Sequence, residues 1–206
     1  TVPYRQRSQK LPFMLGFKYS IADKLVLNKF RAALGGKVRA CSSGGSALSK
    51  EVGSFFCGIG ISIIEGYGLT ETSPVMTIGH PDLFKFGTVG KAIPGVEVKI
   101  QPDGEIVCRG HNVMMGYYKN EEATNEAIID GWFHSGDIGE FDEDGLLRIT
   151  DRKKSLIVTS GGKNVAPQPM EVSLTSNKYI EQCNIVGDDR NFCLLYTSPS
   201  PRDSIR

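Results

Sequence analysis

The stretch GYGLTETSPV, residues 66–75, gathers side chains that could bind a nucleotide. Tyr67 offers a flat aromatic face, and stacking a base on such a face contributes about 1–3 kcal/mol. The Thr70 hydroxyl can donate to a phosphate oxygen, and the Glu71 carboxylate is a hard oxygen ligand suited to Mg²⁺. A surface turn needs glycine and proline, but it does not need an aromatic ring, a hydroxyl and a carboxylate in this order. The stretch therefore favours a nucleotide site over a plain loop.

Two residues farther along the chain extend this set. Asp137, within HSGDI, brings two acceptor oxygens that can hold a ribose diol. Arg152 brings a rigid cationic fork. Any one of these side chains alone is more often solvated or structural. Together they supply a base stack, a phosphate donor, a metal ligand, a sugar clamp and a cation, which is what a nucleoside monophosphate site needs.

Three competing motifs fit the sequence less well. A P-loop is absent, because Lys163 is followed by Asn164 instead of serine or threonine. A nucleophile elbow is absent, because Leu48 stands two positions after Ser46 where glycine is required. Residues 140–151 imitate a calcium loop, but the first ligand would be Glu, the last Asp, and both flanks alternate like strands. A hairpin turn is the favoured interpretation of that stretch.

The elements that must position these residues follow from the hydrophobic pattern. It predicts a helix over 21–34, a strand over 37–43, a helix over 47–57 and a strand over 61–65. Ser20 and Gly35 are expected to bound the first helix, and Gly58 to end the second. Alternating strands and helices predict a parallel sheet, whose ligands lie beyond the carboxyl ends of the strands. The loops SSGGS and GYGLTE both follow strands, so we expect them to converge.

The pattern changes after Phe86. Hairpins are predicted over 96–110 and 140–152, with a short helix over 121–129 between them. After Asp151 the pattern indicates a further hairpin and then a helix that prolines begin. The fold class expected from these elements is mixed α/β (α+β).

Composition excludes several classes of protein. The chain has 206 residues, 40% of them hydrophobic and 23% charged, with 24 Lys and Arg against 23 Asp and Glu. A net charge of +1 gives no overall field for nucleic acid or an anionic membrane. No apolar run approaches the roughly 18 residues of a membrane span. The five cysteines form no CxxC pair and stand apart from the three histidines, which argues against a zinc cluster or a disulfide framework and favours a reducing compartment.

Five blocks of sequence carry a resemblance to a known family: SSGGSAL, GYGLTETSPV, GTVGKAIPGVEVKI, GEIVCRGHNVMMGYY and GWFHSGDIGEFDEDGLLRITDRKKSLIVTSGGKNVAPQPME. Over residues 34–192 the chain resembles the adenylate-forming (ANL) superfamily, and within it the long-chain fatty acid–CoA ligases, or acyl-CoA synthetases. The resemblance implies a partial two-domain fold. Residues 1–150 would be the C-terminal part of the large AMP-binding domain, and 151–193 the hinge and the start of the small C-terminal domain.

Residues 194–206 would form a tail outside the family. It resembles a translated cloning or sequencing adaptor joined near Cys193, and the other interpretation is a divergent Pro/Ser-rich end. We expect this tail to stay unpacked, because it holds too little apolar surface to offset the entropy of ordering it.

The resemblance also implies a role for each matching residue. Gly44, Gly45 and Ser46 would border the adenine; Gly66, Tyr67 and Gly68 would form its shelf; Thr70 would touch the phosphate; Glu71 would hold Mg²⁺; Asp137 would clamp the ribose; and Arg152 would reach the ribose from the linker. Thr70, Glu71 and Arg152 would take part in catalysis. Residues 151–153 would be the hinge on which the small domain turns, and residues 159–164 would approach the channel for the CoA thiol.

The activity implied is the activation of a long-chain fatty acid with ATP and its transfer to coenzyme A. ATP or AMP, Mg²⁺ and coenzyme A would be bound, nucleic acid would not, and the location would be cytoplasmic, with peripheral association at the cytosolic face of a membrane left open. The family's phosphate loop would lie before residue 1 and its catalytic lysine after residue 206, so the chain alone is expected to be inactive. A ligase for an aryl, medium-chain or amino acid, and a non-catalytic AMP-binding fragment, remain as alternatives.

Overall fold

The structure is a computed structural model that describes residues 1–155, 157–161, 164–165, 167–175, 177–188, 190 and 193–199. Its first half contains the helices α1 (Val2–Gln6), α2 (Phe13–Ala22), η1 (Asp23–Leu27), α3 (Asn28–Ala33), α4 (Lys50–Ile59) and η2 (Thr70–Thr72), and the strands β1 (Ala40–Ser43), β2 (Ser62–Gly68), β3 (Val75–Ile78), β4 (Lys91–Ala92) and β5 (Val96–Ile100). Its second half contains β6 (Glu105–Gly110), α5 (Glu121–Ala127), β7 (Ile128–Ile129), β8 (Trp132–Phe141), β9 (Leu147–Arg152), η3 (Lys153–Ser155), β10 (Ile157–Val158), β11 (Asn164–Val165), α6 (Pro167–Thr175), β12 (Ile180–Val186) and β13 (Leu194–Pro199).

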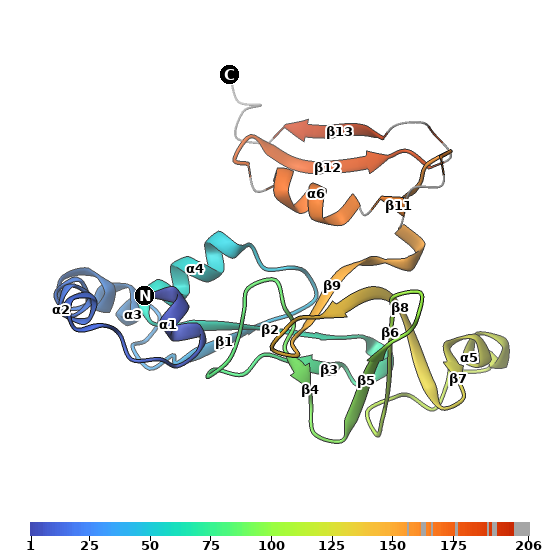
Figure 1. Ribbon diagram of the computed structural model, residues 1–206, viewed down its shortest axis with the longest axis horizontal. Coiled ribbons are helices and arrows are strands. Elements are labelled where there is room, and N and C mark those ends of the chain that lie inside the picture. The colour runs from blue at the N-terminus through green and yellow to red at the C-terminus, as the bar shows by residue number, and fades with distance from the viewer. Residues whose placement is uncertain are drawn as a thin grey trace.

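The first sheet has the strand order β1-β2-β3-β4 (Figure 1). β1 and β2 pair in parallel, from Ala40 opposite Ser62 to Ser43 opposite Glu65, and α4 lies between them in the chain. This confirms the predicted strand–helix–strand unit. The predicted end of its helix was wrong: α4 runs through Gly58 and stops at Gly60, which adopts the left-handed conformation that ends helices.

The helical segment before this sheet starts earlier than the pattern predicted. Pro12 has an extended ψ and precedes α2, so the helix begins at Phe13 and Ser20 lies inside it instead of capping it. The chain continues through the π-helix η1 into α3, which ends before Gly35 and Gly36, both at positive φ. Gly35 therefore acts as the predicted stop.

The second sheet is antiparallel, with the order β5-β6-β8-β7 and β9 added on β8. Both predicted hairpins, β5–β6 and β8–β9, are present. The stretch that imitated a calcium loop is the β8–β9 turn: one Asp142 oxygen accepts the backbone N–H groups of Asp144 and Leu146, and the Lys85 ammonium contacts the Asp142 and Asp144 carboxylates at 2.9 and 2.6 Å. The Lys85 ammonium therefore lies where a calcium ion would have to bind between these carboxylates.

One cluster of buried side chains joins the two sheets. Met76 of β3, Cys108 of β6 and Phe133 of β8 pack together, and Tyr67 and Leu69 pack against them. Tyr67 and Leu69, the second and fourth residues of the GYGLTE stretch, are thereby fixed to the core.

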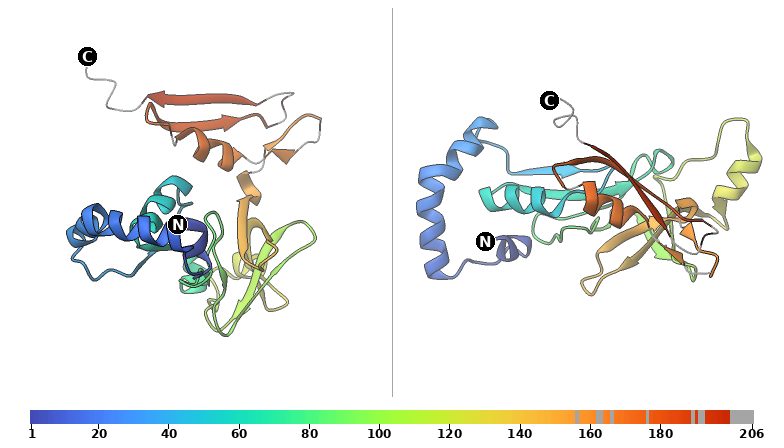
Figure 2. Two further views of the ribbon diagram at one scale, coloured as in Figure 1. Left: turned by 60° about the vertical axis from the view of Figure 1, so that its left-hand side comes forward. Right: turned by 90° about the horizontal axis from the view of Figure 1, so that it is seen from above.

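The C-terminal segment forms a small layer of its own, with α6 lying under the hairpin β12–β13 (Figures 1 and 2). The predicted hairpin and proline-led helix are present as β10–β11 and α6. The expectation that residues 194–206 stay unpacked was wrong for 194–199, because β13 pairs along the whole of β12. Its backbone donors and acceptors thus gain partners, and Leu194 and Leu195 line the groove beside α6. Within the described residues, no helix is long and apolar enough to cross a membrane.

Candidate functional site

A buried carboxylate in the middle of β2, directly before GYGLTE, holds the segment that follows SSGGS. Glu65 is only 7% exposed, and its two oxygens accept the backbone N–H groups of Leu48 (3.2 Å) and Gly87 (3.1 Å). Burial raises the pKa of Glu65, while these two hydrogen bonds act to lower it. A Cβ added to Gly44 would lie 3.5 Å from the carbonyl oxygen of Gly66, so the backbones of the two loops approach closely. The predicted convergence of SSGGS and GYGLTE is confirmed.

The turn between β2 and β3 is fixed by its own side chains and backbone. Gly68 faces the Pro74 carbonyl so closely that any side chain there would collide with it. The buried Thr72 hydroxyl accepts from the Leu69 N–H (2.9 Å) and lies within hydrogen-bond distance of the carbonyls of Leu69 and Pro74. Thr70 and Glu71 occupy the single 3-10 turn that this geometry creates, where Thr70 is exposed and Glu71 is half-buried.

A neighbouring segment holds this turn from outside. The Asn112 side-chain amide donates to the carbonyls of Thr72 (3.0 Å) and Val75 (3.1 Å), and the Met114 N–H donates to the carbonyl of Glu71 (2.8 Å). The Tyr117 hydroxyl donates to Oε1 of Glu71 at 2.9 Å. That hydrogen bond, together with burial, raises the pKa of Tyr117. The Glu71 carboxylate is therefore held by a phenol from the next segment.

The second candidate carboxylate, Asp137, is 6% exposed and has three partners. Its Oδ2 accepts a hydrogen bond from the Tyr67 hydroxyl at 2.6 Å, its Oδ1 lies 3.4 Å from Nε of Arg152, and its backbone N–H donates to Oγ of Ser135. Burial and the Asp137 carboxylate both raise the pKa of Tyr67, so the phenol stays protonated and donates. Asp137 and Arg152 also stand opposite each other in the β8–β9 ladder.

Behind this group lies a further buried carboxylate, Glu105 of β6. It accepts the backbone N–H of Gly136 (3.0 Å) and lies 3.0 Å from Nδ1 of His134 and 3.1 Å from Nζ of Lys153. Burial acts to raise the pKa of Glu105, but these hydrogen bonds outweigh it and hold the pKa below its usual value. Lys153 also contacts Asp103 at 2.7 Å, so the segment after β9 is tied to the β5–β6 turn.

Asp151 is the most deeply buried carboxylate here, at 1% exposure. One of its oxygens accepts the backbone N–H of Arg152 at 2.6 Å, while Oδ2 has no hydrogen-bond partner among the described residues. Burial raises its pKa, and the nearby charge of Glu171 acts in the same direction. The predicted hinge thus contains a carboxyl group whose charged form is destabilised by burial.

The structure unites some of the predicted residues and leaves others apart. Asp137 contacts both Tyr67 and Arg152, and Gly44 approaches Gly66, as expected for one site. Gly45 is exposed, and the exposed residues Ser46 and Thr70 make no side-chain hydrogen bond within the described part of the chain. The predicted CoA-channel residues Gly162 and Lys163 lie outside the described residues.

Sequence reasoning missed four residues that support the site. These are Glu65, Glu105, Asn112 and Tyr117. Glu65 carried a usable signal, because a carboxylate that ends an apolar strand must find donors when it is buried. Tyr117 carried none, since its partner stands 46 positions earlier in the chain.

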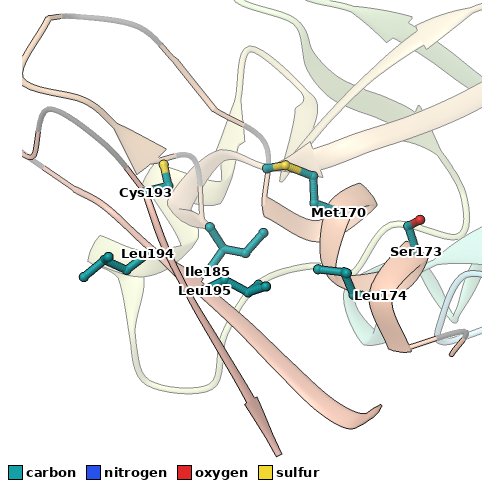
Figure 3. A pocket seen from close by; sticks show the side chains of 7 residues that line it. All are labelled: Met170, Ser173, Leu174, Ile185, Cys193, Leu194 and Leu195. Carbon is teal, nitrogen blue, oxygen red and sulfur yellow. The ribbon is translucent and has the colours of Figure 1, made fainter. Parts of the chain in front are cut away.

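Two hollows lie outside this group of carboxylates. An open apolar groove runs between α6 and the β12–β13 hairpin, lined by Met170, Ser173, Leu174, Ile185, Cys193, Leu194 and Leu195 (Figure 3). A second cleft separates the start of α4 from α6, with Ser49 and Glu51 facing Val172 and Thr175. The described residues contain no group of three or more His, Cys, Asp or Glu side chains that could hold a metal by themselves.

Comparison with known proteins gives consistent matches. The family of AMP-binding enzymes matches residues 12–118, and the C-terminal domain of AMP-binding enzymes matches residues 154–204. The long-chain-fatty-acid–CoA ligase FadD15 of Mycobacterium tuberculosis is 50% identical over 179 residues, which cover 87% of this chain and 30% of that protein. The ligase ACSBG2 of Xenopus laevis is 42% identical over 183 residues, or 85% of this chain and 25% of that protein.

Solved structures agree with the fold. O-succinylbenzoate CoA synthetase (MenE) from Bacillus subtilis in complex with AMP superposes with a TM-score of 0.70 at 27% identity, over 84% of this chain and 40% of that one. Its complex with the acyl-adenylate OSB-AMP gives a TM-score of 0.72 at 26% identity, again over 84% and 40%. The chain therefore has the mixed helix-and-sheet fold of these enzymes, although it spans only about 30% of the length of the FadD15 relative.

Proposed function

The chain belongs to the AMP-binding enzyme family, and from this premise we propose that the protein activates a long-chain fatty acid with ATP and transfers the acyl group to coenzyme A. The observation that carries the proposal is the contact of Tyr67, Asp137 and Arg152, which groups an aromatic ring, a carboxylate and a cation at one place. The 50% identity to a long-chain-fatty-acid–CoA ligase supports this choice of acid.

In this proposal the nucleoside lies on the edge where the two loops meet. Tyr67 gives its ring to the adenine, Gly44 to Ser46 and Gly66 to Gly68 leave room for the base, and Asp137 accepts hydrogen bonds from the ribose hydroxyls. Thr70 is exposed with a free hydroxyl, as a donor to the α-phosphate must be. Arg152 is 69% exposed at its side chain, so its guanidinium can reach the ribose or phosphate without losing much packing.

The residues present also fit Mg²⁺. This ion keeps several waters and is usually bound by one or two carboxylates together with substrate phosphates. Glu71 offers one half-buried carboxylate with Oε1 bonded to Tyr117, and the described residues hold no larger cluster of ligands. When bound, the ion would neutralise charge on the phosphates.

The proposed reaction has two steps. A fatty acid carboxylate oxygen attacks the α-phosphorus of ATP, and pyrophosphate leaves with the bond electrons, which gives an acyl-adenylate. The thiol of coenzyme A then attacks the acyl carbon, AMP leaves, and the thiol proton is released. Thr70 and Arg152 stabilise the anionic groups of the first step by hydrogen bonding and charge.

The experiment that tests the proposal measures pyrophosphate release from ATP by the protein of full family length, with palmitate, a medium-chain acid, benzoate and an amino acid as acids. We expect palmitate to give the highest kcat/KM and Asp137→Ala to weaken ATP binding about tenfold or more. Faster turnover of another acid would favour the alternative ligase. For the 206-residue chain alone we propose weak AMP binding and no pyrophosphate release; release above background from this chain would contradict that part.

A further inference from the structure

We propose that Tyr117 is a positioning residue that holds the Glu71 carboxylate in place for the metal ion. The inference deepens the proposed function and depends on it, because it takes Glu71 as the metal ligand. It starts from the 2.9 Å hydrogen bond between the Tyr117 hydroxyl and Oε1 of Glu71, which joins two segments 46 residues apart.

Glu71 needs outside support because of where it stands. It lies in a 3-10 turn of three residues and is only half-buried. Its long side chain would otherwise exchange among rotamers, and fixing it costs conformational entropy each time a ligand binds. A hydrogen bond that is already formed removes part of that cost, which is how groups around metal ligands raise affinity.

Tyr117 is itself fixed by contacts on its other side. Its backbone N–H donates to Oγ1 of Thr124 at 2.9 Å, and that hydroxyl donates to the carbonyl of Asn120. Gly116 stands beside Thr124, where an added Cβ would come within 2.7 Å of it, so the backbone packs closely against α5. The phenol therefore approaches Glu71 from an anchored segment and not from a free loop.

The same segment also holds the backbone of the turn. Met114 donates to the Glu71 carbonyl, Asn112 donates to the Thr72 and Val75 carbonyls, and Met114 packs against the Met76–Cys108–Phe133 cluster. Backbone and side chain of Glu71 are thus fixed relative to one rigid support. Within the described residues Oε2 has no hydrogen-bond partner, so one oxygen stays available to a metal while the other is held.

The test compares nucleotide affinity with and without magnesium in the 206-residue chain. ATP is titrated in MgCl₂ and in EDTA and followed by NMR of the nucleotide, which reports weak binding. Tyr117→Phe should leave the affinity for ATP in EDTA unchanged. It should reduce the increase in affinity that magnesium produces by about tenfold, which is the low end of the loss expected when a residue that supports a metal ligand is removed. The matched control is Tyr118→Phe, since Tyr118 is 87% exposed and its hydroxyl makes no hydrogen bond among the described residues.

A double variant separates positioning from general damage to the fold. In a Glu71→Gln background, Tyr117→Phe should change the magnesium gain no further, whereas a merely structural role would lower affinity in EDTA in both backgrounds. If Glu71→Gln loses the gain and Tyr117→Phe keeps it, the proposed function stands and the role of Tyr117 is overturned. If the parent chain shows no magnesium gain at all, the role of Tyr117 is overturned, while the proposed function is still decided by pyrophosphate release from the protein of full family length.

Discussion

The hydroxyl of Tyr67 donates to Oδ2 of Asp137 across 2.6 Å, which joins β2 of the first sheet to β8 of the second. Two residues expected to contact different parts of a nucleotide, the base and the ribose, are therefore in contact with each other. Tyr67 also packs against the core cluster of Met76, Cys108 and Phe133. The carboxylate is thus oriented by a side chain that the core itself fixes.

This geometry predicts how Asp137 contributes to binding. Hydrogen bonds to a charged group contribute about 1.5–3 kcal/mol each, so Asp137→Ala should weaken AMP binding at least about tenfold. The loss should depend on the ribose hydroxyls, and the measurement is a titration with AMP and with 2′,3′-dideoxy-AMP. Asp137→Ala and the parent should bind the dideoxy nucleotide equally. An equal loss for both nucleotides would mean that Asp137 acts through Tyr67 or the fold and not on the ribose.

A second prediction concerns the loop junction at Glu65. Glu65→Ala removes the acceptor for the N–H groups of Leu48 and Gly87. A buried donor left unpaired costs about 1–3 kcal/mol, and each kcal/mol lowers Tm by about 2–4 °C in a chain of this size. Thermal unfolding should therefore show a fall of several degrees. The control is Glu97→Ala, which removes an exposed ion pair with Arg109 and should change Tm little.

Much of this architecture could be predicted from the pattern of apolar residues. The β1–α4–β2 unit, the two hairpins and the proline-led α6 all show in that pattern, because each depends on neighbours in the chain. The wrong helix ends were predicted at places where two nearby residues could each have begun or ended the helix. Gly58 and Gly60 both could end α4, and the structure uses Gly60; Ser20 could cap a helix, but Pro12 begins one earlier.

The candidate site could be predicted only in part, for a related reason. Residue types pointed to Tyr67, Asp137 and Arg152, since a ring, a carboxylate and a guanidinium have recognisable chemistry. Their support by Glu65, Glu105 and Tyr117 depends on pairs separated by 17 to 48 positions, which no local pattern encodes. Such pairs are set by the packing of two sheets and appear only when the chain is folded.

A third prediction uses the buried carboxyl of Asp151. Burial raises its pKa in the folded state, so folding favours the protonated form, and this contribution is lost as pH rises through the raised pKa. Asp151→Asn keeps the size and removes the charge. It should raise Tm at pH 7, and the advantage should shrink as pH falls toward 4 and the parent side chain becomes neutral.

Asp103 provides a control, because its pKa is shifted in the opposite direction from that of Asp151. The hydrogen bond from Lys153 lowers its pKa, so its contribution is present above the pKa of the unfolded chain and is lost as pH falls. Asp103→Asn should therefore lower Tm slightly at pH 7 and not at pH 3. Thermal unfolding across this pH range measures both variants, and parallel pH profiles for the two would contradict the assignment of their environments.

The last prediction concerns β13, where the expectation from sequence and the structure disagree. β13 pairs with β12 from Leu194 opposite Val186 to Pro199 opposite Ile180, and Leu194 and Leu195 line the groove over α6 beside the buried Ile185. Truncation after Cys193 removes these partners and leaves β12 with an unpaired edge. Because unpaired backbone groups exchange with solvent, hydrogen exchange at the amides of β12 should rise strongly, while exchange in β6 and β8 stays the same. The matched control is truncation after Pro199, which removes residues 200–206 and keeps the pairing, so exchange in β12 should not change. Equal exchange in all three chains would mean that the tail stays unpacked in solution, as its Pro/Ser-rich composition first indicated.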